Sequence, residues 1–176
     1  AIAPSSTFHS TVAQPELAAF LQRLDTEFDP PLSTRTDIGD YATKMIAKAT
    51  LVVARREDQL VGVAAAYCND TSSKIAYMTY LGVAPEARGG GLGGQLVTEI
   101  IRLATQQGMR SLELQTDAGR EAAVRFYLRL GFHVVASYER FGGFHAVRLK
   151  RTIAADSTGK PATKASSADE HRQNPL

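Results

Sequence analysis

The hydrophobic pattern near the N-terminus has the period of a helix. Apolar residues at helical spacing predict two helices there, one with Leu17, Phe20, Leu21 and Leu24, and one with Ile38, Tyr41, Ala42, Met45, Ile46 and Ala49. Pro15 suits the first turn of the first helix, and Thr36 or Asp37 can cap the second. Residues 29–36, DPPLSTRT, cannot continue a helix, because paired prolines remove backbone donors and fix φ. We therefore expect an irregular loop between the two helices.

The period then changes to that of extended chain. Residues 50–56, 60–68 and 75–83 predict three strands, and the short polar turns between them favour antiparallel pairing. A helix over about 92–107 follows, then a strand over 110–116, a helix with Phe126, Tyr127 and Leu130 on its apolar stripe, and strands over 133–138 and 145–150 that meet across Gly142 and Gly143. Residues 75–116 therefore form a strand, helix, strand crossover, which implies two parallel strands. The expected fold class is α/β, a mixed sheet flanked by helices.

Length and composition indicate one domain. The chain has 176 residues, of which 44% are hydrophobic, and this is enough for one sizeable core. Large apolar side chains nearly vanish after residue 151, where Ser, Thr, Ala, Pro and charged residues dominate. We expect a domain over residues 1–151 and a polar, flexible tail over residues 152–176.

Charge and cysteine content exclude several functional classes. Lys and Arg total 20 against 18 Asp and Glu, so the net charge of +2 supplies no basic surface for nucleic acid. No apolar run reaches the roughly 18 residues of a membrane span, and the first ten residues lack the pattern of a signal peptide. Cys68 is the single cysteine and has no disulfide partner within the chain. These features favour a cytoplasmic protein without a membrane or nucleic-acid partner.

The glycine-rich loop APEARGGGLGGQLV, residues 84–97, lies between a predicted strand and a predicted helix. A nucleoside triphosphate site is excluded, because Gln95 and Leu96 stand where that motif has its lysine and hydroxyl residue. Gly89, Gly91 and Gly94 have the spacing of a dinucleotide-binding turn, but Pro85 ends the strand several residues too early. That spacing alone is weak evidence for a nicotinamide cofactor.

A pyrophosphate fits the loop better. Glycines let backbone N–H groups converge on an anion, and a helix N-terminus carries roughly half a positive charge. Arg88 adds a planar guanidinium suited to phosphate oxygens. The candidate anion-binding residues are Arg88, Gly89, Gly90, Gly91, Leu92, Gly93 and Gly94.

Two motifs in this order resemble the GNAT superfamily of acetyl-CoA-dependent N-acetyltransferases. The family's central motif, Gln/Arg-x-x-Gly-x-Gly/Ala, matches Arg88 to Gly93, and the later stretch REAAVRFYLRLGF matches its second motif from Ala123 to Phe132. The resemblance covers about residues 8–150 and excludes the tail. One position departs from the family pattern, because Arg120 stands where an Asn commonly binds the pantetheine or diphosphate arm.

The resemblance implies a GNAT-like acyl-CoA N-acyltransferase fold with a splayed central strand, and acetyl-CoA as the co-substrate. It also implies that backbone N–H groups of Leu81, Gly82 and Val83 bind the thioester and pantetheine. Arg120 remains a candidate for phosphate contact in place of the Asn.

Acetyl transfer to an amine needs a proton acceptor and a proton donor. Tyr127 is the candidate general acid, with a phenol of reference pKa about 10, although its place on an apolar helical stripe also suits a core residue. No base is identified. Some relatives carry a Glu where this chain has Tyr77, and candidates include Asp70, which also suits a turn, His133, His145 and a water chain.

These features predict direct acetyl transfer from acetyl-CoA to a primary amine, such as an amino sugar, amino acid or polyamine. We expect residues 29–36 to form much of the acceptor pocket, and we expect no metal, since no His/Cys spacing suggests one. The alternative is a non-catalytic acyl-CoA-binding module or complex partner. A peptide acceptor or a nicotinamide-cofactor oxidoreductase fits less well, and the last two strands offer an edge for a possible homodimer.

Overall fold

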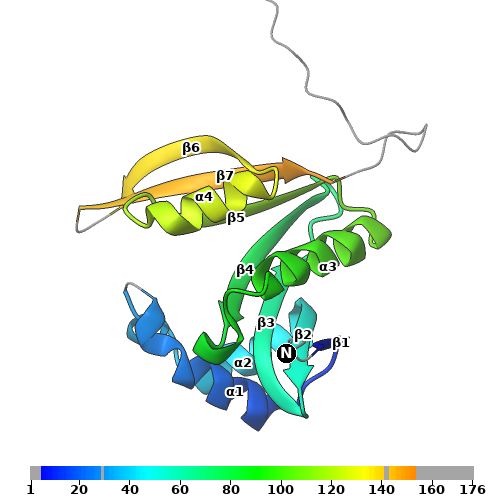
Figure 1. Ribbon diagram of the computed structural model, residues 1–176. Coiled ribbons are helices and arrows are strands. Elements are labelled where there is room, and N and C mark those ends of the chain that lie inside the picture. The colour runs from blue at the N-terminus through cyan, green and yellow to red at the C-terminus, as the bar shows by residue number, and fades with distance from the viewer. Residues whose placement is uncertain (1–4, 29, 141–142, 154–176) are drawn as a thin grey trace, which may run out of the picture.

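The computed structural model describes residues 5–28, 30–140 and 143–153. Its centre is a seven-stranded mixed sheet with the strand order β1-β2-β3-β4-β5-β7-β6 (Figure 1). The strands are β1 (Thr7–His9), β2 (Thr50–Arg56), β3 (Gln59–Tyr67), β4 (Ile75–Val83), β5 (Ser111–Asp117), β6 (His133–Arg140) and β7 (Phe144–Thr152). The helices are α1 (Gln14–Arg23), α2 (Ile38–Lys48), α3 (Leu92–Gln106) and α4 (Glu121–Arg129), with short 3₁₀ turns η1 (Asp25–Glu27), η2 (Leu32–Thr34) and η3 (Pro85–Ala87).

The elements confirm the predicted mixed α/β class. Pro15 lies in the first turn of α1, and the Asp37 side chain accepts a hydrogen bond from the Asp40 amide at the start of α2. Strand β1 was not predicted, because its three exposed residues carry no alternation of apolar and polar side chains. Gly142 and residues 154–176 lie outside the described residues, so the tail and part of the last turn stay predictions.

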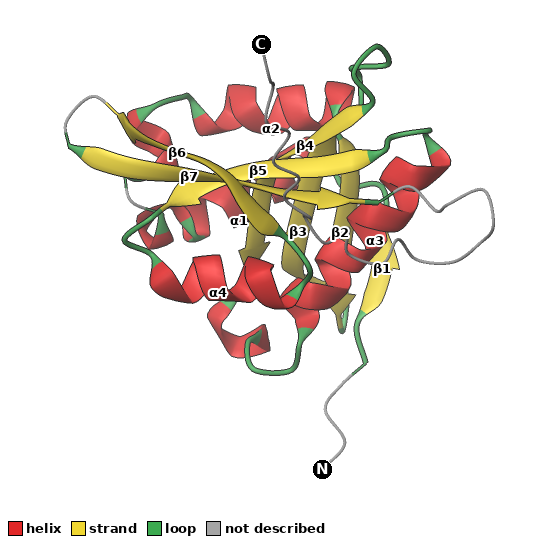
Figure 2. Cartoon of the chain, turned by 90° about the horizontal axis from the view of Figure 1, so that it is seen from above, coloured by secondary structure: helices red, strands yellow, loops and turns green. Residues whose placement is uncertain are grey.

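Helices cover both faces of the sheet beside β3. All residues of β3 from Leu60 to Ala66 are buried, which requires cover on the two sides to which successive side chains point. Helix α3 packs on β2, β3 and β4, and Figure 2 shows α2 and α4 on opposite sides of the strands. Gly62 has no room for a side chain, because a Cβ there would lie 2.9 Å from Leu96 Cδ1 of α3.

The sheet opens between its two parallel strands. β4 and β5 pair only over Ile75–Tyr77 and Ser111–Glu113, after which the two strands diverge (Figure 1). β4 also carries a bulge, where its register against β3 shifts between Ala65 and Ala66. The predicted splayed strand is therefore confirmed, and the opening separates one arm (β1–β4) from the other (β5–β7).

The outer edge of the second arm is exposed. β6 is the last strand of the sheet, and Val134 and Val135 on it are 46% and 39% exposed. Such an edge can pair with another strand. A homodimer through β6 stays a prediction.

Candidate active site

A cavity of about 610 Å³ fills the opening between β4 and β5. Its walls come from six segments: residues 24–35 between α1 and α2, β4 from Tyr77 to Val83, Arg88 of the glycine loop, β5 from Leu114 to Asp117, Arg120 with the α4 residues Ala123, Phe126 and Tyr127, and His145 and Ala146 of β7. Because β4 has no strand partner on the β5 side beyond Tyr77, every second backbone amide there faces the opening. The segment predicted to hold a thioester, Leu81, Gly82 and Val83, lies in this part of β4, and all three residues line the cavity.

The predicted anion-binding loop forms an open turn at the start of α3. Gly89 and Gly91 have φ values of 84° and 79°, a backbone conformation that residues other than glycine rarely adopt. Gly91 is the N-cap residue of α3, and no side chain caps the helix there. The first amides of α3 are therefore available to an anion, as the sequence predicted. Gly90 lies near a second cation, because its Cβ would lie 4.0 Å from Arg56 Nη2.

Arg88 points back toward the cavity wall. Its Nε donates to the Val83 carbonyl oxygen at 3.0 Å, and its Nη2 lies 3.1 Å from Glu27 Oε2. Arg88 also lines the cavity, next to the end of β4. An anion at the glycine loop would have to compete with Glu27 for this guanidinium.

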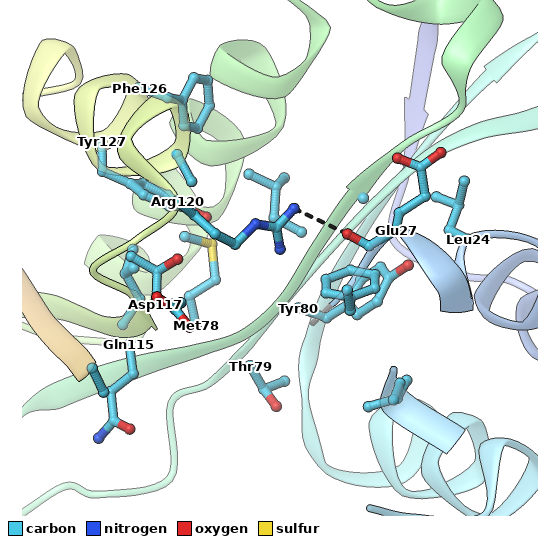
Figure 3. Close-up of a pocket in the computed structure, with 18 of the residues that line it drawn as sticks. Leu24, Glu27, Met78, Thr79, Tyr80, Gln115, Asp117, Arg120, Phe126 and Tyr127 are labelled. Carbon is cyan, nitrogen blue, oxygen red and sulfur yellow. Dashed lines mark hydrogen bonds between the residues drawn. The ribbon is translucent and has the colours of Figure 1, made fainter. Parts of the chain in front are cut away.

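Arg120 spans the opening from the other side. It is the N-cap residue of α4, and its Nη2 donates to the Glu27 carbonyl oxygen at 3.0 Å (Figure 3). Both arginines that were predicted to bind the coenzyme therefore contact the same residue, Glu27. The glutamate joins the α1–α2 loop to the glycine loop and to α4.

The β4 bulge is held by α2. The Tyr41 hydroxyl lies 3.1 Å from the Thr79 carbonyl oxygen and 2.7 Å from Thr79 Oγ1, so a side chain replaces the strand partner that the bulge removes. Burial raises the pKa of Tyr41, which keeps the hydroxyl protonated as a donor. Farther along β4, a Cβ on Gly82 would lie only 2.6 Å from the Tyr80 hydroxyl oxygen. The strand therefore requires glycine at a position that lines the cavity.

Tyr127 lies on the α4 wall of the cavity (Figure 3). Its ring makes edge contacts with Phe126 and Phe132, at centroid distances of 5.0 and 5.5 Å. Burial raises the pKa of Tyr127, and the nearby Arg120 guanidinium opposes that rise. Tyr127 thus has a packed ring, as expected of a core residue, and it also lines the cavity, as a general acid would have to. Its role as general acid stays a prediction.

The candidate bases lie in different places. Asp70 accepts hydrogen bonds from the Ser72 and Ser73 amides and from Ser73 Oγ, so it stabilises the turn after β3. Among the described lining residues are His145 and Tyr77, whereas Asp70 and His133 are absent.

Asp117 is a cavity residue that the sequence interpretation missed. It ends β5, lines the cavity, and accepts a hydrogen bond from the Gly119 amide at 2.6 Å through Oδ1 (Figure 3). Its neighbour Gln115 also faces the opening. One signal was available, because ligands commonly bind at the carboxyl ends of parallel strands. This rule would have pointed to Asp117 only if the separation of β4 and β5 before that residue had been known.

The irregular α1–α2 loop lines the acceptor side, through Phe28, Pro30, Leu32 and Arg35. Asp25 anchors it, since its carboxylate accepts from the Ser33 amide at 2.9 Å and from the Ser33 hydroxyl at 2.5 Å. These hydrogen bonds lower the pKa of Asp25. The described part of the loop predicted from residues 29–36 therefore reaches the cavity, and residue 29 lies outside the described residues.

The model of the acetyltransferase (GNAT) family matches residues 17–132 of the chain. The chain belongs to this family. A mycothiol acetyltransferase from Streptomyces avermitilis is 36% identical over 100 residues, which cover 56% of this chain and 32% of the relative. The chain thus spans about a third of the length of this curated relative.

Solved structures of acetyltransferases share the fold. A GNAT-family structure from Desulfovibrio desulfuricans has a TM-score of 0.70 at 22% identity, and covers 85% of this chain and 100% of its own. An acetyltransferase from Salmonella typhimurium, solved with its cofactor acetyl-CoA, has a TM-score of 0.70 at 16% identity and covers 89% and 99%. The family is the one that the two sequence motifs predicted, and the Salmonella structure contains acetyl-CoA.

Two further observations concern the described part of the chain. It contains no helix long and apolar enough to cross a membrane. Within residues 5–28, 30–140 and 143–153, no group of three or more His, Cys, Asp or Glu side chains is placed to hold a metal ion.

Proposed function

We propose that this GNAT protein transfers an acetyl group from acetyl-CoA directly to the primary amine of a small molecule. The observation that carries the proposal is the cavity itself, which has Arg88, next to the uncapped glycine loop, in one wall and the α1–α2 loop in another. The similarity to mycothiol acetyltransferases, whose name specifies a small-molecule acceptor, supports a small molecule over a protein.

In this proposal the coenzyme diphosphate binds the amides of Gly89 to Gly94 at the start of α3. Arg88 and Arg120 leave Glu27 and turn to the phosphate oxygens, because a phosphate offers a guanidinium two acceptors in place of one carboxylate or carbonyl contact. The pantetheine arm then lies along the unpaired edge of β4. This edge directs the thioester toward Leu81, Gly82 and Val83.

The reaction needs a neutral amine, an oxyanion site and a leaving thiol. The amine nitrogen attacks the thioester carbon, the carbonyl oxygen accepts hydrogen bonds from β4 amides, and the C–S bond breaks as the carbonyl re-forms. The amine loses one proton and the coenzyme sulfur gains one, so the products are the acetamide and free coenzyme A. Asp117 is the carboxylate placed to attract the protonated amine, since the other described carboxylate in the cavity, Glu27, pairs with Arg88.

Tyr127 is assigned the role of general acid. Because burial raises its pKa, its phenol remains protonated at neutral pH and can donate to the departing sulfur. Its ring packing fixes the direction of the hydroxyl group.

The test of this function is thiol release from acetyl-CoA across a panel of amino acids, amino sugars, polyamines and short peptides. Turnover with at least one small amine supports the proposal. Coenzyme binding without turnover on any amine would instead favour a non-catalytic acyl-CoA-binding module, the alternative suggested by Arg120 in place of the family's Asn.

A further inference from the structure

The charges of the cavity are unbalanced. Among the described residues that line it, Arg35, Arg88 and Arg120 are cationic, and Glu27 and Asp117 are the carboxylates. Glu27 pairs with Arg88, and one oxygen of Asp117 accepts from the Gly119 amide. Among the described lining residues, cationic side chains therefore outnumber carboxylates.

Arg35 is the lining arginine that would have no anionic partner after the coenzyme binds. Within the part of the chain that the structure describes, its guanidinium has no hydrogen-bond or ion-pair partner. Arg88 and Arg120 lie on the glycine loop and on α4, where the coenzyme is expected, whereas Arg35 lies on the α1–α2 loop across the cavity. The exposed Arg35 therefore lines the cavity from the loop that was predicted to form the acceptor pocket.

The position of Arg35 is fixed by its backbone. It directly follows η2, and its amide donates to the Leu32 carbonyl oxygen at 3.0 Å. The turn is anchored by two residues: the Leu32 side chain is buried, and the Ser33 amide donates a hydrogen bond to Asp25. Burial raises the pKa of Tyr41 and the nearby Arg35 guanidinium opposes that rise, and Tyr41 holds the β4 bulge at Thr79. A cation is thus presented next to the strand on which transfer would occur.

We propose that the acceptor is an amine that carries a carboxylate close to its amino group, as in an α-amino acid, and that Arg35 binds this carboxylate. The amino group then lies toward Asp117 and the β4 edge, and the carboxylate toward the α1–α2 loop. A guanidinium binds a carboxylate through two parallel hydrogen bonds, which would orient the amine as well as hold it.

The same charges argue against the other small-molecule acceptors. A polyamine or a polycationic amino sugar requires several carboxylates, whereas the described lining has two, Glu27 and Asp117, and Glu27 pairs with Arg88 in the structure without ligand. The like charges of Arg35 and Arg120 would repel a second ammonium group. The inference rests on the proposed acetyltransferase activity and narrows its acceptor.

The first experiment compares matched acceptors with the wild-type protein. For several side chains, kcat/KM is measured for the α-amino acid, its α-carboxamide and the corresponding amine without the carboxyl group. The amino acid should exceed both analogues by about tenfold or more, the size of a hydrogen bond to a charged group. This preference would oppose intrinsic reactivity, because a carboxamide has the lower amine pKa and the larger neutral fraction.

The second experiment changes the arginine. Arg35→Gln should raise KM for the amino acid by about tenfold or more and leave kcat, KM for acetyl-CoA and KM for the carboxamide nearly unchanged. Arg35→Lys should restore part of the affinity, because it keeps the charge and loses the planar fork. Arg110→Gln is the matched control, since Arg110 is exposed and lies at the opposite end of β5 from the cavity.

The outcomes separate the two proposals. If the carboxamide or the simple amine is acetylated as well as the amino acid, or if Arg35→Gln affects all acceptors equally, the carboxylate assignment is wrong while the acetyltransferase stands. If no amine of any kind is acetylated, the proposed function itself fails.

Discussion

The two arms of the sheet are packed to different degrees. Most of the largest fully buried side chains belong to the N-terminal arm and its helices, for example Leu17 of α1, Met45 of α2 and Leu96 of α3. The C-terminal arm contributes Leu112 and Leu149, whereas the residues of α4, all of which the structure describes, are at most partly buried, Tyr127 included. One arm is a closely packed scaffold, and the other is a thinner wall across the cavity.

The difference places the candidate site between a rigid surface and a more adaptable one. Elements with few buried contacts need less free energy for local opening. Movement of α4 can therefore widen the cavity for a coenzyme at little cost to the scaffold that holds β4. Contacts with Glu27 connect the two sides across this opening in the structure without ligand.

The largest expected difference between the arms is in stability. Leu96→Ala on α3 should lower the free energy of unfolding by about 2–5 kcal/mol, because the side chain is 0% exposed and its removal leaves a cavity. Leu128→Ala on α4, where the side chain is 45% exposed, should cost less than about 1 kcal/mol. Denaturant unfolding of both variants measures the contrast, and equal losses would show that the arms are packed alike.

The next effect concerns catalysis on the thinner wall. Tyr127→Phe should lower kcat by about 10²-fold or more and leave the Kd of acetyl-CoA nearly unchanged, because only the hydroxyl group is lost. Tyr138→Phe on β6 is the matched control, since Tyr138 does not line the cavity. A Tyr127→Phe protein with normal kcat would remove this residue from the mechanism and leave the family assignment intact.

A smaller effect is expected at the contact between the arms. Glu27→Gln removes the charge that holds Arg88, so the Kd of coenzyme A should fall about 1.5- to 5-fold, the range of an exposed ion pair. Calorimetric titration measures the change. Glu99→Gln, which breaks the Arg102 pair on α3, should leave this Kd unchanged. Weaker coenzyme binding after Glu27→Gln would mean that Glu27 supports the coenzyme site.

The smallest effect is a dependence of stability on pH. The pKa of Asp25 is lowered in the folded protein, so its contribution to stability is present above the unfolded pKa and is lost as the pH falls from about 5 toward 2. Asp25→Asn should flatten that part of the pH dependence and raise KM for the acceptor, because the α1–α2 loop loses its anchor at Ser33. Asp70→Asn removes similar contacts outside the cavity and should flatten the pH dependence alone. If the acceptor KM of Asp25→Asn were unchanged, the contact between Asp25 and Ser33 would not be needed for the acceptor pocket.

The sequence by itself determined most of the elements, the fold class and the glycine turn before α3. Hydrophobic periodicity is a local property, so the bounds of β2 and β4 were predicted to the residue. The glycines before Leu92 predicted an anion site, because the positive φ angles of such a turn are also a local property. The two motifs also identified the family. Only β1 was missed among the strands, since its three exposed residues pair with β2 without a hydrophobic pattern of their own.

The tertiary structure decided which residues share the cavity. Glu27 and Arg35 lie between α1 and α2 and Asp117 ends β5, far along the chain, and they line one cavity only because β4 and β5 separate after three residue pairs. The same packing turned Arg88 and Arg120 to one glutamate and assigned Asp70 to a turn. Helix and strand propensities depend on neighbouring residues along the chain. The set of charges around the cavity depends instead on where β4 and β5 separate. Neither strand has a sequence pattern that marks this point.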